Sequence, residues 1–241
     1  MNILLITHYY FPEGNAAASR VSSLAQRWVK QGHKVTVVVC APNAPKGIIY
    51  DGYKNRYMKE TIAGVKIIRI KIYIAASKGV FRRTISHISY MISAVWNCMF
   101  MKKPDIMIAS SPHFFVGWAG VLLHWLRRFP FILDVRDIWP ESIQAVGAKI
   151  PGPIIFILEI MEKIMYNSAK HIVAVGDGYK QRLVEKGVAE NKISVVMNGV
   201  DSTTFFPKEK NNTLLEEFNI KDKFIASYTK SGKNFKRKKI R

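Results

Sequence analysis

ILLITHYYFPEGNAAASRVSSLAQRWVKQGHKVTVVVC, residues 3–40, reads as strand, loop, helix and strand in succession. Residues 3–7 and 34–40 are short apolar runs of the kind that forms buried strands. Between them, apolar residues recur at the spacing of one helix face: Val21, Leu24, Ala25 and Trp28. Gly32 follows at the point where that helix should end. The stretch therefore predicts a strand–helix–strand unit of a parallel sheet.

The same alternation continues along the chain. Further apolar runs, separated by helix-like stretches, lie at 65–74, 106–110, 131–135, 171–175 and 193–197. Strands that are apolar on both faces predict an α/β fold with a doubly wound parallel sheet, covered by helices on both sides. Such folds bind ligands beyond the carboxyl ends of their strands, so the loops after the strands are the candidate sites.

Composition and cysteine content are those of a globular chain. Of the 241 residues, 49% are hydrophobic, which is enough for a sizeable core. Cys40 and Cys98 are far apart in sequence, so we expect small core residues in a reduced compartment, without a disulfide framework or a zinc site. Met1 opens directly onto a strand, and no secretory signal is expected.

The formal net charge of +20 is unevenly distributed. Residues 221–241 hold nine Lys or Arg against the single acid Asp222, a net +8 that leaves +12 for the rest of the chain. That remainder is still basic enough to favour an anionic partner: nucleic acid, a membrane surface or a phosphorylated substrate.

The first loop, HYYFPEGN at 8–15, lies where a dinucleotide fold would carry GxGxxG. Only Gly14 is present, and the strand that ends VVVC at 37–40 lacks the acid expected for a ribose, so dinucleotide binding is disfavoured. One glycine before a helix still permits close backbone approach, and the helix N-terminus favours an anion. The alternative is an ordinary strand-to-helix turn.

The loop DVRDIWPES, 134–142, concentrates charge at the end of a buried strand, at Asp134, Arg136, Asp137 and Glu141. Burying such groups is costly unless they pair or bind a ligand. One interpretation is an Arg136–Asp137 or Arg136–Glu141 ion pair, with Pro140 turning the chain. The functional interpretation places one carboxylate against a substrate hydroxyl and one guanidinium against a phosphate. At another strand end, SSPHFF (110–115) offers two hydroxyls and His113 as a second candidate.

Residues 84–101 form a run of eighteen residues without a formal charge, flanked by Arg82, Arg83, Lys102 and Lys103. The length alone would admit a membrane span. Polar residues recur every three or four positions, however, at Ser86, Ser89, Ser93 and Asn97, which predicts an amphipathic helix. It is either a core helix of the domain or a helix at a bilayer interface, with its cations over anionic lipid headgroups.

Taken in order, these loops resemble the N-terminal half of glycosyltransferase family 4 enzymes of GT-B fold, in the branch that builds bacterial surface polysaccharides. The likeness covers about residues 1–220 and is carried by HYYFPEGNAAAS (8–19), GHKVTVV (32–38), KKPDIMIASSP (102–112), FILDVRDIWPES (131–142), AVGDGYKQRLVEKGV (174–188) and KISVVMNGVDSTTFFP (192–207).

The resemblance implies a retaining transfer of a sugar from a nucleotide-sugar donor to a saccharide or lipid-linked acceptor, at the cytoplasmic face of the membrane. It implies no cofactor and no metal. Many relatives carry His-Asp where this chain has Arg136–Asp137, so Asp137 becomes the expected catalytic residue and acceptor contact. Further substrate contacts are expected at Pro12, Glu13, Gly14, Asn15, His113, Arg136 and Glu141, and membrane contacts at Arg82, Arg83, Lys102 and Lys103.

The resemblance also implies a domain plan. Residues 1–200 would be the acceptor-side domain, 201–222 a linker with a helix near 214–218, and 223–241 the start of a donor domain that gives way to a basic, disordered tail. We therefore expect a truncated form with little activity of its own. One alternative is a non-catalytic, membrane-associated acceptor-binding module served by a separate donor-domain chain. Specific nucleic-acid binding ranks last, because no aromatic-basic platform or recognition helix is evident.

Overall fold

The computed structural model describes the chain apart from residues 76–78, 143–149, 201, 203–205, 208–211 and 218–241. The chain divides into two compact units, Met1–Asn198 and Gly199–Arg241. In the second unit, helix α7 spans Asn212–Glu217, close to the helix predicted near 214–218. The predicted start of a donor domain and the basic tail, 223–241, lie outside the described residues.

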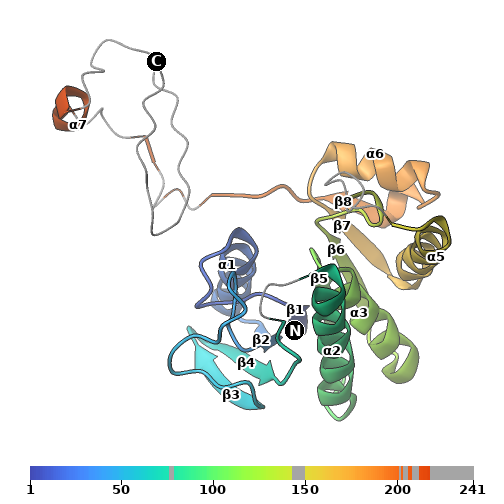
Figure 1. Cartoon of the computed structure of the whole chain (residues 1–241), viewed down its shortest axis with the longest axis horizontal. Coiled ribbons are helices and arrows are strands. Elements are labelled where there is room, and N and C mark those ends of the chain that lie inside the picture. Colours follow the sequence, from blue (N-terminus) through green and yellow to red (C-terminus); the bar gives the residue numbers. More distant parts are fainter. Residues whose placement is uncertain (76–78, 143–149, 201, 203–205, 208–211, 218–241) are drawn as a thin grey trace. The chain divides into compact units, whose positions relative to one another are not determined.

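The first unit is built on one sheet, in which the described residues form eight strands. These are β1 Asn2–Thr7, β2 Lys34–Cys40, β3 Met58–Ile62, β4 Val65–Ile70, β5 Ile106–Ser110, β6 Phe131–Val135, β7 His171–Ala174 and β8 Ile193–Val195. Their order across the sheet is β3-β4-β2-β1-β5-β6-β7-β8, and every neighbouring pair is parallel except β3 and β4. The predicted doubly wound α/β fold is confirmed (Figure 1).

The antiparallel strand β3 is the element that sequence patterning did not predict. Among the described strands it lies at the edge and pairs with β4 alone, and its residues are exposed or half-buried. Ala63 and Gly64 both have positive φ, 49° and 77°, which is the two-residue turn that a tight hairpin requires. A strand with one paired edge and no buried face carries no apolar run, so it gave no signal.

Helices cover both faces of the sheet, as Figure 1 shows. They are α1 Ala16–Lys30, α2 Val80–Met99, α3 Phe114–Arg127, α5 Gly152–Ser168 and α6 Asp177–Glu185, with a 3-10 turn at Glu190–Lys192. Side chains alternate between the two faces along β1: Ile3 and Leu5 pack with α1, while Leu4 and Ile6 pack in the core of α2, α3 and α5. Cys40 and Cys98 are free and buried, as predicted for small core residues.

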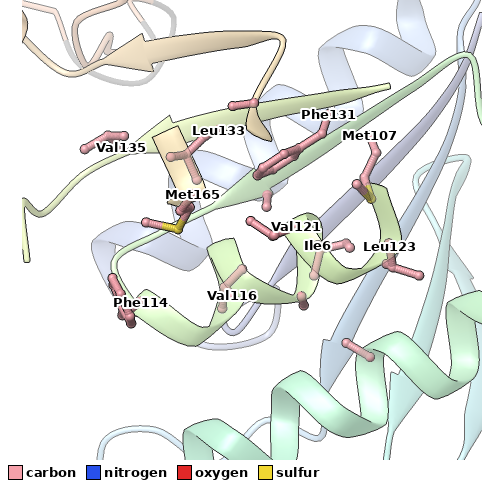
Figure 2. Close-up of a cluster of buried hydrophobic side chains, with 14 of the residues drawn as sticks. Ile6, Met107, Phe114, Val116, Val121, Leu123, Phe131, Leu133, Val135 and Met165 are labelled. Atoms are coloured by element: carbon pink, nitrogen blue, oxygen red, sulfur yellow. The ribbon is translucent and has the colours of Figure 1, made fainter. Parts of the chain in front are cut away.

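Helix α3 packs directly on the sheet (Figure 2). Its apolar side chains pack on those of β5 and β6 in one core cluster, which Met165 of α5 joins. Two glycines permit this approach. A Cβ atom on Gly120 would lie 2.5 Å from Cε2 of Phe131, and one on Gly117 would overlap Sδ of Met165. Phe131 is fully buried, so its ring has no room to move away.

We therefore expect Gly120→Ala to lower the free energy of unfolding by about 1–3 kcal/mol, because the added methyl overpacks the core. Urea denaturation followed by circular dichroism measures this change. The matched control is Gly178→Ala in α6, where among the described residues nothing lies within 4 Å of the added Cβ. Equal stability of the two variants would contradict the close packing of α3.

The sheet also fixes where a ligand site should lie. From β1 the chain crosses first to β2 and β4 on one side, and later to β5, β6, β7 and β8 on the other. The switch point is therefore the crevice between the carboxyl ends of β1 and β5, where doubly wound folds bind ligands. His8 follows β1 at this crevice, and residues 111–113 follow β5.

Candidate functional site

Asp134, at the carboxyl end of β6, is the centre of an ionic network. It is buried, and its Oδ2 atom lies 2.9 Å from Nη1 of Arg20 on α1. Its Oδ1 atom lies 2.8 Å from Nε of Arg136, and the hydroxyl of Ser110 on β5 donates a hydrogen bond to Oδ2 at 2.6 Å. Side chains from α1, from β5 and from the loop after β6 thus all contact the Asp134 carboxylate.

This network corrects the predicted pairing of Arg136. Both proposed ion pairs, with Asp137 and with Glu141, are wrong: Arg136 pairs with Asp134. Asp134 lies on β6 and Arg136 in the bend directly after the strand, where the chain turns its side chain back onto the Asp134 carboxylate. Glu141 instead pairs with Arg182, at 2.8 Å, and with Lys186, at 3.0 Å.

The network carries a surplus of positive charge, because two guanidinium groups share one carboxylate. Arg136 also donates from Nη1 to Oδ1 of Asn198 at 3.1 Å, and Arg20 donates from Nη2 to Ser110 Oγ at 2.6 Å. Burial lowers the pKa of Arg20, an effect that Asp134 opposes. Excess positive charge at the end of a sheet favours an anionic ligand such as a phosphate.

Asp137 differs from its neighbours in lacking a partner. Within the described residues, no ion pair or hydrogen bond to its carboxyl group is found. It is half-buried, and burial raises its pKa above the usual value of 3.8. It lines a small pocket that also includes Ser111, His113, Trp139 and Tyr166. The fold thus brings together two of the predicted site residues, Asp137 and His113.

Two of the four predicted contacts of the first loop, Glu13 and Asn15, have structural roles. Glu13 is buried, and its Oε1 accepts the backbone N–H groups of Asn43 and Ala44, both at 2.9 Å. Asn15 caps α1 by accepting the N–H of Ala18 at 2.8 Å. Gly14 is exposed, and among the described residues nothing lies within 4 Å of a Cβ built on it, so the fold itself does not require glycine there. Substrate contact by Pro12, Glu13, Gly14 and Asn15 stays a prediction.

Arg69 holds this loop in place and was not singled out from the sequence. Its side chain is fully buried in β4; Nε pairs with Glu60 at 2.6 Å, and Nη2 donates to the Phe11 carbonyl at 2.6 Å. Nη1 donates to the Cys40 carbonyl at 3.2 Å. The available signal was an arginine within the apolar run VKIIRI, since a buried cation requires several partners.

Three histidines converge at the switch point. His8 follows β1, His87 lies on α2 and His113 precedes α3. The ring centroids of His87 and His113 are 4.0 Å apart, and those of His8 and His113 are 4.7 Å apart. Nε2 of His113 lies 3.0 Å from the Tyr9 hydroxyl. Burial lowers the pKa of all three, to about 3 for His8 and about 4 for His87, so the imidazoles are neutral at pH 7. From the sequence His113 stood alone.

Helix α2 carries its predicted polar stripe on the protein side. Ser86 is buried, and Ser89 Oγ accepts the N–H of Tyr73 at 2.8 Å. The outward side chains are apolar and exposed: Val80, Phe81, Ile85, Ile92, Trp96, and Phe100 just beyond the helix. The flanking cations Arg82, Arg83, Lys102 and Lys103 are exposed as well. Of the helices in the described part of the chain, none is long and apolar enough to cross a bilayer.

Residues 15–199 match the model of the glycosyl transferase 4-like domain. Because this match covers well over half of the chain, the protein belongs to that family of glycosyltransferases, and its fold is the Rossmann-like half of a GT-B enzyme.

One similar sequence and two similar solved structures are consistent with this family assignment. The chain is 29% identical over 133 residues to the capsular polysaccharide biosynthesis glycosyltransferase CapM of Staphylococcus aureus, a match covering 53% of this chain and 33% of CapM. Sucrose-phosphate synthase of Thermosynechococcus elongatus superposes with a TM-score of 0.62 at 12% identity, over 90% of this chain and 52% of the synthase. HepE of Anabaena, solved with UDP-glucose, superposes with a TM-score of 0.54 at 11% identity, over 92% of this chain and 50% of HepE. The chain thus spans about a third of this curated relative and about half of these solved structures.

Proposed function

We propose that this chain forms the acceptor-binding half of a retaining glycosyltransferase. The enzyme would transfer a sugar from a nucleotide-sugar donor to a saccharide or lipid-linked acceptor during surface polysaccharide biosynthesis. The observation that carries the proposal is the half-buried Asp137 carboxyl, which has no partner among the described residues and lies one residue from the positively charged network of Arg20, Asp134 and Arg136. The role of CapM in capsular polysaccharide biosynthesis and the UDP-glucose bound by HepE support the reaction class.

In this proposal Asp137 accepts a hydrogen bond from the acceptor hydroxyl as that oxygen bonds to the anomeric carbon. A carboxyl whose pKa is raised towards the working pH is a better proton acceptor than an ordinary aspartate. Arg20 and Arg136 would hold a phosphate group of the acceptor, since their joint charge exceeds that of Asp134. The diphosphate that leaves with the nucleotide would be stabilised by a donor-binding half. The nucleotide-sugar is a substrate, and no cofactor enters the scheme.

Binding of a lipid-linked acceptor tests the proposal directly. The purified chain is titrated with a polyprenyl-diphosphate saccharide in detergent micelles, and separately with the same saccharide lacking the diphosphate. We expect saturable binding of the first and at least tenfold weaker binding of the second. Absence of saturable binding of either ligand would overturn the proposal.

The runner-up function is a non-catalytic module that presents the acceptor to a separate donor-domain chain. The same preparation distinguishes the two when nucleotide-sugars are added with and without a donor-domain polypeptide. Transfer by the chain alone would identify it as an enzyme in its own right. Transfer that requires the added polypeptide would favour the module.

We further propose that α2 docks the protein on the cytoplasmic, anionic face of the cell membrane. Its outward apolar side chains have no covering element among the described residues, and cations flank both ends of the helix. Helices α3 and α5, in the same layer, add exposed apolar side chains: Trp125, Leu126, Ile154, Phe156, Ile157 and Ile160. Apolar side chains between basic ends suit the boundary between acyl chains and anionic headgroups.

The double variant Ile92→Ser/Trp96→Ser should reduce binding to phosphatidylglycerol vesicles by about tenfold or more, because each large side chain contributes about 1.5–3 kcal/mol when fully buried. Vesicle co-sedimentation at physiological salt provides the measurement. Ile48→Ser, which removes an exposed apolar side chain from the loop after β2, is the matched control and should bind as the parent does. Equal losses in the two variants would rule out α2 as the docking element.

A further inference from the structure

We propose that His8, His87 and His113 form a binding site for one divalent transition-metal ion of the zinc class. One nitrogen from each ring lies within 4.8 Å of the other two. The three residues come from the loop after β1, from α2 and from the loop after β5, so only the folded chain brings them together. This inference goes beyond sugar transfer and differs from the sequence-based expectation of no metal.

The spacing is close to what a metal requires. With zinc–nitrogen bonds of about 2.0–2.1 Å and tetrahedral angles, bound imidazole nitrogens lie about 3.4 Å apart. The three nitrogens here are all within 4.8 Å of one another, so modest side-chain rotations would bring them into range. The site lies at a packed crevice, since the ring of His8 also contacts that of the fully buried Tyr90, with centroids 5.0 Å apart.

The chemistry of the cluster suits a metal ion. His8 is buried, His87 and His113 are half-buried, and imidazole nitrogens are common ligands of transition metals. His8 is only 5% exposed, and within the described residues its buried Nδ1 atom has no hydrogen-bond partner. An unsatisfied nitrogen in that position costs free energy that a coordinate bond would offset. A set of three imidazoles without a carboxylate suits zinc, copper or nickel and not magnesium or calcium.

Two neighbours bear on the site. The Tyr9 hydroxyl lies 3.0 Å from Nε2 of His113, and a hydrogen bond between them would fix the orientation of that ring. Arg83, one turn before His87 on α2, is a cation that interacts electrostatically with His87. Arg83 is exposed, so its charge can turn into solvent and need not face a bound metal.

A metal at this position would join three elements at the switch point. It would connect the first loop and α2 to the loop that carries His113, which also lines the Asp137 pocket. The ion's role would be to position these loops, while Asp137 remains the group that touches substrate.

The test is metal titration of the full chain after chelator treatment. Isothermal titration with zinc chloride should give one ion per chain, with a Kd in the micromolar range or below, and zinc should raise the melting temperature. Cobalt(II) should give the intense visible absorption of a tetrahedral site. His87→Ala should weaken zinc binding at least a hundredfold, and His33→Ala, a histidine outside the cluster, should leave it unchanged.

His87→Gln serves as a second variant, because it retains side-chain volume on α2 if His87→Ala fails to fold. Zinc binding lost in either His87 variant and retained in His33→Ala would support the site. No stoichiometric binding by the parent chain, or equal binding by a folded His87 variant, would overturn it and leave the cluster as neutral ring packing alone.

Discussion

Asp134→Asn should lower the free energy of unfolding by about 3–5 kcal/mol, the cost of removing one partner from a buried ion pair. The substitution leaves the guanidinium groups of Arg20 and Arg136 close together without their counter-charge. The amide also disturbs the hydrogen bond from Ser110, since one of its two terminal atoms is no longer an acceptor. The expected loss is a large fraction of the stability of an ordinary domain.

Urea denaturation at pH 7 measures this change. The matched control is Glu141→Gln, which also removes a carboxylate that pairs with two cations, Arg182 and Lys186, but at a solvent-accessible position. A surface pair contributes little, so the control should be much less destabilised. Adding Arg20→Met to Asp134→Asn should restore part of the lost stability, because it removes one uncompensated charge. Similar losses for Asp134→Asn and the control would show that the network does not stabilise the fold.

Asp137→Asn should reduce sugar transfer by about 10²- to 10⁴-fold, the usual contribution of a positioned proton acceptor. This expectation rests on the proposed function and is measured on the chain together with a donor-domain polypeptide. Over a range of pH, parent activity should fall as the pH drops through the raised pKa of Asp137, because the protonated carboxyl no longer accepts a hydrogen bond.

The free energy of unfolding should depend on pH in the opposite sense to activity. The folded-state pKa of Asp137 lies above its unfolded value, so its protonated form favours folding and stability falls as pH rises through that interval. Asparagine cannot ionise, and at pH 7 Asp137→Asn should therefore be at least as stable as the parent. Destabilisation comparable to that of Asp134→Asn, or unchanged transfer, would show that Asp137 has been assigned the wrong role.

The strands could be predicted from the sequence, because a strand that is buried on both faces requires a continuous run of apolar residues. All seven predicted runs correspond to strands, although 65–74 was too long, since β4 ends at Ile70. The polar edge strand β3 was missed for the converse reason. The polar stripe of α2 was identified correctly, but the sequence did not decide which side it faces, because serine and asparagine can satisfy their hydrogen bonds against backbone groups. Ser89 and Asn97 donate to the carbonyls of Ser86 and Ser93, which lets the polar stripe face inward.

The charged loop at 134–142 could also be identified from the sequence, because charged groups next to a buried strand must pair or bind a ligand. The residues that pair with this loop could not be predicted. Arg20 and Ser110 are 90 residues apart, and their contact exists only because α1 and β5 meet at the switch point. The same holds for the three histidines: His113 was a candidate in its own loop, but nothing in the sequence linked it to His8 or His87.

The sequence by itself determined the parallel sheet, its helical layers and the loops at which chemistry could occur, since hydrophobic periodicity is a local property of the chain. Only the tertiary structure decided which charges pair, which carboxyl has no partner in the described part of the chain and which imidazoles meet. Those outcomes depend on distances between segments remote in sequence, and a change of an ångström or two decides whether a buried group is satisfied.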